Sequence, residues 1–321
     1  MKPIKVCFIS LRSYPLFAKK SPDYFGGAEV QINLLASELA KDKHFSISVI
    51  TGDYGQPAII KQGRLSLLKT KLFDFFRILK LADADIYIER TINPKILLVY
   101  LFCRLFHKKF IYMVAHDWDL NHSAIKLADL IITQHQQQNK MLKFNNLVVP
   151  SLIKFGPNKK IFKRKYILWV GRADSWKNYQ AFIELAKNYP QEKFLMICRS
   201  GQQKTPATDL PNLKIISFVP ATKILDFFRQ AKILVNTSEA EGFPNTFLQA
   251  GVTKTPVLSY RVNPDNYINK YHCGLIGRNR LKQMLHNPAR LKSLGINHYQ
   301  YVKKYHSLKN IEIFKQTLCK L

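Results

Sequence analysis

The chain has 321 residues, of which 47% are hydrophobic and 22% are charged. This composition is typical of globular proteins and excludes a largely disordered chain, and the length is sufficient for two ordinary domains. The formal net charge of +29 is unusual, and most of the excess lies after residue 150. Such a charge would attract polyanions, namely phosphate-bearing substrates, an anionic membrane or nucleic acid. A generally lysine-rich proteome would produce the same excess, so charge alone does not choose among these partners.

Neither a membrane span nor a disulfide framework is expected. The longest apolar run, at residues 96–103, is well short of the roughly 20 residues that cross a bilayer, and the first residues suit a buried strand better than a secretory signal. The five cysteines are scattered and include no C-x-x-C pair, which favours reduced thiols over disulfides or a zinc site. We therefore expect a cytoplasmic protein.

Strand and helix patterns alternate through the first 150 residues. Strands are predicted at residues 5–10, 45–52, 85–89, 109–115, 128–133 and 148–150, with helices at 28–42 and after the third strand. A further helix is predicted at residues 64–81, with leucines and phenylalanines on one face and Lys69, Arg77 and Lys80 on the other. This β-α-β alternation predicts a parallel, doubly wound sheet.

Residues 151–165 combine turn residues with six basic residues, and we interpret them as an interdomain linker. The alternation then restarts, with strands at 166–171, 193–198, 213–219, 233–238 and 256–260 and helices at 178–189, 223–231 and 244–253. The predicted fold class is α/β, with two Rossmann-like domains facing a cleft at residues 1–150 and 151–303. Residues 304–321 form a closing helix. Ligands in such sheets bind beyond the carboxyl ends of the strands.

Two glycine-containing segments follow predicted strands. Residues 25–29 place Gly26 and Gly27 at a helix start, where free amides can bind a phosphate or sugar oxygen, although a plain glycine turn is the favoured explanation when this segment is taken alone. The full dinucleotide-binding glycine pattern is absent, so NAD is not predicted. In residues 170–178, Gly171 is followed by Arg172 and Lys177, two cations that could stabilise a departing diphosphate or could be solvated surface charges.

Residues 237–251 carry the most informative pattern. A strand ends, a Glu-Gly turn follows, and Pro244 opens a helix whose amides would face an anion. Glu241 can accept hydrogen bonds from sugar hydroxyls, and Gln249 lies two turns along the helix. Helix capping would explain Asn245 or Thr246, but not the whole string. The candidate donor-binding residues here are Gly242, Phe243, Pro244, Asn245, Thr246 and Gln249.

One histidine lies at a predicted strand end in the first domain. His116 follows the strand at residues 109–115, where it would reach the edge of the sheet that binds ligands. A structural role for a single histidine remains an equally open interpretation.

In this order, the four segments resemble the retaining glycosyltransferases of family 4, which have the GT-B fold, over nearly the whole chain. The resemblance implies a hexosyltransferase with a nucleotide-sugar donor, a glycan or lipid-linked acceptor and no obligatory metal. It also implies residue roles: Gly26 and Gly27 near the donor phosphates and acceptor, Arg172 and Lys177 on the diphosphate, and Glu241 and His116 near the transferred sugar. The final helix of such enzymes crosses back onto the first domain.

The chain departs from the family pattern at several positions. Gln249 replaces the second of two glutamates, the one that holds the ribose diol, and an amide can accept such a bond only without charge. Arg199 and Ser217 replace glycines that usually follow strands of the second domain. Three other interpretations therefore remain open: a non-catalytic partner subunit, a basic nucleic-acid-binding protein without a recognition motif, and a metal-dependent GT-A transferase using Asp117 and Asp119 or Asp83 and Asp85.

Overall fold

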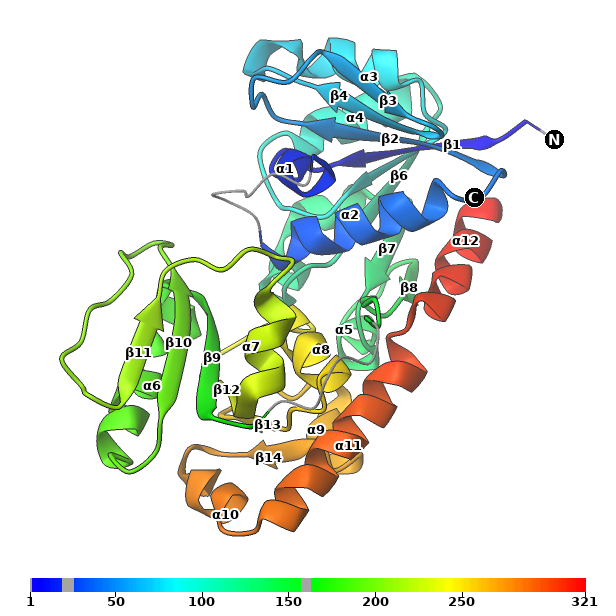
Figure 1. Cartoon of the computed structure of the whole chain (residues 1–321). Helices are drawn as coiled ribbons and strands as arrows, with labels where there is room; N and C mark the ends of the chain where they lie inside the picture. The colour runs from blue at the N-terminus through cyan, green and yellow to red at the C-terminus, as the bar shows by residue number, and fades with distance from the viewer. Residues whose placement is uncertain (1, 19–25, 157–162) are drawn as a thin grey trace. The chain divides into compact units, whose positions relative to one another are not determined.

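A computed structural model describes residues 2–18, 26–156 and 163–321 (Figure 1). The chain divides into two compact units. Unit 1 comprises Met1–Leu152 and Leu308–Leu321, and unit 2 comprises Ile153–Ser307. The first division falls close to the predicted boundary at residue 150. The second falls at residue 307, so that residues 304–307, which the sequence interpretation assigned to the closing helix, belong to unit 2.

Unit 1 contains a doubly wound sheet with the strand order β3-β4-β2-β1-β5-β6-β7-β8. All neighbouring strands are parallel except β3, which is antiparallel to β4. The strands are β1 (Ile4–Ile9), β2 (Phe45–Thr51), β3 (Ile59–Gln62), β4 (Leu65–Lys69), β5 (Ile86–Glu89), β6 (Lys109–Met113), β7 (Leu130–Thr133) and β8 (Asn146–Val148). Their long apolar runs are buried because helices cover both faces of such a sheet.

The helices of unit 1 form two layers. One layer, α2 (Gly27–Leu39) and α12 (Ile311–Cys319), packs residues such as Leu35 and Phe314 into one core. The other layer, α3 (Phe75–Ala82) and α4 (Ile96–Leu105), packs residues such as Leu79 and Phe102 into a second core on the opposite face. The short helices are α1 (Tyr14–Phe17) and α5 (Gln136–Lys140). Segment 308–321 is thus part of unit 1, as the family resemblance implied.

The predicted helix at residues 64–81 is wrong. Leu65–Lys69 instead forms β4, which pairs parallel to β2 and antiparallel to β3, and α3 begins only at Phe75. Gly63 turns the chain between β3 and β4 with φ of 62°, a conformation that glycine adopts without steric cost. The leucines of β4 are buried on both faces of the sheet, and such a run also satisfies helical spacing over a few residues.

Unit 2 contains a fully parallel sheet with the order β11-β10-β9-β12-β13-β14. The strands are β9 (Tyr166–Arg172), β10 (Phe194–Arg199), β11 (Leu213–Ile216), β12 (Ala231–Asn236), β13 (Val257–Ser259) and β14 (Gly274–Ile276). The helices are α6 (Tyr179–Asn188), α7 (Ile224–Gln230), α8 (Asn245–Val252), α9 (Tyr267–Lys270), α10 (Leu281–Leu285) and α11 (Pro288–Tyr305). The predicted α/β class with two Rossmann-like domains is confirmed.

Helix α8 is packed closely against α11, and this packing fixes the direction in which α8 begins. A Cβ atom added at Gly251 would lie 2.3 Å from a methyl carbon of Val302, so only glycine permits this approach. Phe247 and Leu248 of α8 lie in the same core as Val302. The start of α8, which carries several candidate site residues, is therefore held on a rigid support.

Among the described residues, no helix is long and apolar enough to span a bilayer. The five cysteines are free thiols, and Cys198 and Cys273 are buried in the core.

Candidate active site

The candidate site of unit 2 lies where its strand order reverses. The chain runs outward from β9 to β10 and β11 and then returns to the other side of β9 with β12. Ligands of doubly wound sheets bind at the carboxyl ends of the strands at such a switch point. Two loops meet there: residues 172–178, which follow β9, and residues 237–244, which follow β12.

Lys177 and Glu241 form an ion pair across these two loops. The two side chains are only 17% and 10% exposed, and the hydroxyl of Ser238 donates a second hydrogen bond, of 2.8 Å, to the same carboxylate oxygen. Lys177 also lies over the Trp176 ring, with its Nζ 4.0 Å from the ring centroid. The predicted cation and the predicted sugar-contacting carboxylate are therefore brought together, and each neutralises the charge of the other.

Further hydrogen bonds hold the two loops together. The Trp169 indole donates to the Thr237 hydroxyl at 2.9 Å, and that hydroxyl donates to the Lys177 carbonyl at 2.7 Å. The backbone amide of Glu239 donates to the Trp176 carbonyl at 2.9 Å. Such a network holds the Lys177–Glu241 pair in one geometry before any ligand arrives.

Arg172 is held by a buried carboxylate. Its Nη2 lies 2.6 Å from Oδ2 of Asp174, a residue that is 2% exposed, while the other carboxylate oxygen accepts the Gln202 amide at 2.9 Å. The Arg172 side chain remains 46% exposed, so it can meet a second anion. Position 171 requires a glycine, because a Cβ atom there would lie 2.7 Å from the Trp169 ring.

Helix α8 begins at Asn245, with Pro244 as its N-cap residue and Gly242 in the turn before it. The first turn of a helix presents backbone amides without intrahelical partners, so it is a suitable place for an anion. Asn245, Thr246 and Gln249 are partly exposed along α8. Phe243 is different: its side chain is buried in the core against Tyr267 and His306, so any contact with a ligand is left to its backbone.

Unit 1 has its own switch point, between β1 and β5, and the sequence interpretation missed its residues. Ile9 and Glu89 are register partners at the ends of these strands, and Arg90 follows directly. The side chains of Glu89 and Arg90 are buried. Neither Oε2 of Glu89 nor Nε of Arg90 has a hydrogen-bond partner within the described part of the chain. Burial raises the pKa of Glu89 to about 8 and lowers the pKa of Arg90 to about 10.

The predicted residues of unit 1 lie at the start of α2 and directly after β6. Gly26 is the N-cap residue of α2, and its amide donates to the Glu29 carboxylate at 2.7 Å, while Gly27 is the first helical residue. His116 follows β6, and its Nδ1 accepts the Trp118 amide at 3.3 Å. Burial lowers the pKa of Arg90, and the carboxylates of Asp119 and, less strongly, Glu29 act electrostatically against this effect. Phe25, the first residue of the predicted glycine segment, lies outside the described residues.

The aspartates of the alternative metal-dependent interpretation have structural partners. Asp119 accepts the amides of Ala115 and His116, at 2.8 and 3.0 Å, and Asp117 accepts the Gln138 side-chain amide at 2.8 Å. Asp83 pairs with Lys5 at the opposite end of the sheet. Over the described ranges, no three His, Cys, Asp or Glu side chains gather as metal ligands would. The two-domain parallel-sheet fold shows that the GT-A interpretation is wrong.

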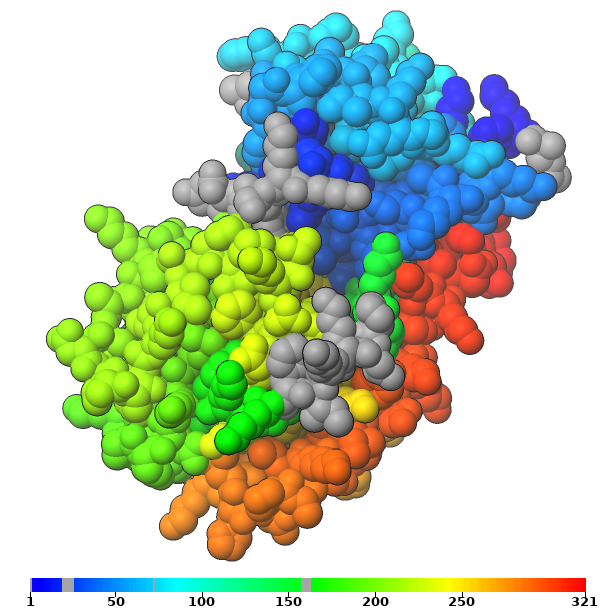
Figure 2. Space-filling view, in the orientation of Figure 1, coloured from blue at the N-terminus to red at the C-terminus, as the bar shows by residue number. Residues whose placement is uncertain are grey.

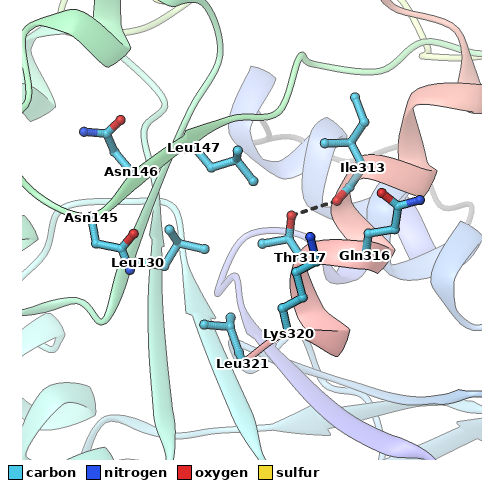
Figure 3. Close-up of a pocket in the computed structure, with 9 residues that line it drawn as sticks. All are labelled: Leu130, Asn145, Asn146, Leu147, Ile313, Gln316, Thr317, Lys320 and Leu321. Atoms are coloured by element: carbon cyan, nitrogen blue, oxygen red, sulfur yellow. Dashed lines mark hydrogen bonds between the residues drawn. The ribbon is translucent and has the colours of Figure 1, made fainter.

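A groove of about 360 Å³ in unit 1 lies away from the switch point of that unit (Figure 3). It is lined by residues of β7, β8 and α12, including Leu130, Leu147 and Ile313, and the Thr317 hydroxyl donates to the Ile313 carbonyl within it. None of the predicted site residues lines this groove.

Residues 153–305 match the family described as glycosyl transferases group 1. The amylovoran biosynthesis glycosyltransferase AmsD of Erwinia amylovora is 22% identical over 250 residues, which cover 71% of this chain and 67% of that protein.

Two solved structures show that the whole chain has the GT-B fold. The sucrose-phosphate synthase of Thermosynechococcus elongatus gives a TM-score of 0.81 at 14% identity, covering 100% of this chain and 98% of that one. The E. coli structure described as trehalose-6-phosphate bound with UDP-2-fluoro glucose gives a TM-score of 0.69 at 13% identity. The similarity covers 98% of this chain and 99% of that one.

The fold and the family match of residues 153–305 together define the class of protein: a glycosyltransferase that uses a nucleotide-sugar donor. The matched residues, 153–305, cover nearly all of unit 2, which comprises Ile153–Ser307. They include Arg172, Lys177, Glu241 and the start of α8.

Proposed function

We propose that the chain transfers a hexose from a nucleoside-diphosphate sugar to an acceptor hydroxyl with retention of configuration, as in glycosyltransferase family 4, and that it acts in the assembly of a cell-surface polysaccharide or lipid-linked glycan. The observation that carries the proposal is the switch point of unit 2, where Arg172, Lys177 and the start of α8 can all meet the diphosphate. The relative AmsD, named for amylovoran biosynthesis, supports a role in polysaccharide assembly.

In this proposal the developing charge of the leaving diphosphate is stabilised by fixed cations and helix amides. Lys177 exchanges its contact with Glu241 for one with the diphosphate, and Glu241 then accepts hydrogen bonds from the hydroxyls of the donor sugar. Arg172, anchored by Asp174, contacts the diphosphate from the same loop. Preorganised donors of this kind lower the barrier because they need no rearrangement during the reaction.

Retention requires the acceptor to approach the face from which the diphosphate leaves. The leaving phosphate oxygen takes the acceptor proton, so this route needs no separate protein base and no obligatory metal. A trehalose-6-phosphate synthase of the same fold, whose study concerns transfer with retention, supports this stereochemistry. We propose that unit 1 binds the acceptor near Arg90 and His116, with Gly26 and Gly27 at the start of α2.

The proposed partners are a nucleotide sugar, a glycan or lipid-linked acceptor and an anionic membrane on the cytoplasmic side, and we expect no nucleic acid as a ligand. A thermal-shift screen with UDP, GDP, ADP and their sugars tests the donor. A ligand at 100 times its Kd should stabilise the native state by about 2.7 kcal/mol. Labelled sugar transfer with the stabilising donor then tests the enzyme, and a purified chain that binds no nucleotide would contradict the proposal.

Gln249→Glu is expected to tighten nucleoside-diphosphate binding or leave it unchanged. Gln249 is partly exposed on α8, where a carboxylate would restore a charged acceptor for the ribose diol. A calorimetric titration of both proteins with the cognate nucleoside diphosphate measures the change. A clear loss of affinity would show that residue 249 does not contact the ribose.

A further inference from the structure

Helix α4 of unit 1 carries large apolar residues on its outer face as well as on the side that faces the core. Val99, Phe102 and Cys103 are buried against the sheet. Four leucines on the outer face, Leu97, Leu98, Leu101 and Leu105, are between 44% and 66% exposed. At about 100° per residue these four positions share one face of the helix. A surface helix normally carries polar residues there, so this face requires an explanation.

Helix α3 extends the same apolar surface. Its Phe76 is exposed and packs against Phe102 and Phe106, with ring centroids 5.3 and 6.1 Å apart. Just before α3, Phe73 is 96% exposed, and Leu81 and Phe106 add further exposed apolar area. The two helices lie side by side on one face of the unit 1 sheet (Figure 1). In Figure 2 the cyan atoms of this part of the chain lie at the molecular surface.

The charges on and around this α3–α4 surface are basic. Exposed Arg77 and Lys80 lie on α3 and exposed Arg104 on α4, and neither helix contains an acidic residue. Lys71 and Lys109 are exposed at the edges of the two helices. Asp74 and Asp83, the carboxylates that flank α3 in the sequence, are paired with Arg77 and with Lys5.

We infer that the α3–α4 surface docks on an anionic lipid bilayer. Exposed leucines and phenylalanines would enter the boundary between headgroups and acyl chains, while the basic residues would contact the negatively charged headgroups. This charge complementarity favours a membrane over a second copy of the chain, because two copies with net charge +29 repel each other. The purpose of docking rests on the proposed function, since a membrane-bound transferase would meet a lipid-linked acceptor.

Vesicle co-sedimentation tests docking without any sugar transfer, so this inference and the proposed function can fail separately. The full chain is mixed with vesicles of phosphatidylcholine alone or with one third phosphatidylglycerol. We expect binding to rise with the anionic lipid and to fall as salt is raised, because exposed charges are screened over about 10 Å at 0.1 M salt. A chain that stays in the supernatant with anionic vesicles at low salt would overturn the inference.

Two sets of variants locate the surface. Leu97→Gln, Leu101→Gln and Leu105→Gln together remove the apolar face but keep a good helix former, so the fold should be retained. Arg77→Gln, Lys80→Gln and Arg104→Gln remove three charges. Each basic residue near an anionic surface raises the membrane-binding constant by about tenfold or somewhat less. We therefore expect the second set to weaken binding on the order of a hundredfold.

Matched controls change the same chemistry elsewhere on the chain. Met141→Gln, Ile296→Gln and Ile313→Gln replace other exposed apolar residues, and Lys187→Gln, Lys193→Gln and Lys214→Gln remove three exposed charges from unit 2. Both control sets should bind vesicles nearly as the unchanged chain does. Equal losses in controls and test variants would overturn the assigned surface. Sedimentation velocity without lipid gives a second way to overturn it. If the unchanged chain self-associates and the leucine variants do not, the apolar face joins two copies of the chain instead of docking on a membrane.

Discussion

Replacing Lys177 with alanine is expected to reduce sugar transfer by a hundredfold or more and, in addition, to destabilise unit 2. The first effect follows because Lys177 is the cation we assign to the leaving diphosphate, and one such donor is worth about two orders of magnitude in rate. The second follows from the structure: Glu241 is 10% exposed and would lose its partner. Leaving one buried charge unpaired costs about 3 kcal/mol or more.

The loss of stability and the loss of activity can be separated with a second substitution. Lys177→Ala with Glu241→Gln removes both charges, so the free energy of unfolding should return toward that of the unchanged chain while transfer stays low. Urea denaturation and turnover of the cognate donor measure the two effects. Near-normal turnover of the folded single variant would show that Lys177 does not stabilise the leaving group.

This result would differ from what the sequence alone predicts for Lys177. The spacing of residues 170–178 and 237–251 identified two polar segments at strand ends, but nothing in the sequence shows that Lys177 and Glu241 contact each other. That contact depends on β9 and β12 being neighbours although α6, β10, β11 and α7 separate them along the chain. Periodicity predicts strands and helices well, whereas strand order and cross-loop pairing depend on tertiary packing.

Where local pattern and tertiary packing favour different structures, the sequence interpretation fails. Residues 65–69 satisfy helical spacing, yet pairing with β2 and β3 buries their leucines on both faces of the sheet.

Arg164 lies in a segment that the sequence analysis interprets as a basic linker. Its guanidinium donates to the carbonyls of Ala231, Thr253 and Lys254, and so ties this segment to β12 and to the end of α8. A single charged residue in a turn-rich segment gives no signal of that role.

The buried carboxyl of Glu89 could not be recognised from the sequence either, because a glutamate that ends a predicted strand usually faces water. In the structure it is 1% exposed, and burial raises its pKa from 4.5 to about 8. The folded chain therefore keeps a proton on Glu89 at neutral pH that the unfolded chain releases. Since the unfolded state binds fewer protons at Glu89 than the folded state between these two values, the contribution of Glu89 to stability is most favourable below pH 4.5 and falls as the pH rises toward 8.

Glu89→Gln is accordingly expected to stabilise the protein at pH 7.5 and to leave its stability nearly unchanged at pH 4.5. Glutamine keeps an oxygen for the amides of Arg90 and Thr91 but has no proton to lose. The gain at pH 7.5 should be on the order of 4 kcal/mol, because each of the three pH units between 4.5 and 7.5 costs the unchanged chain about 1.4 kcal/mol. Urea denaturation at the two pH values measures it. Glu184→Gln, at an exposed position, is the control and should change stability little at either pH. If Glu89→Gln destabilises the protein at pH 7.5, the carboxyl is ionised in the folded state and Arg90 is its partner there.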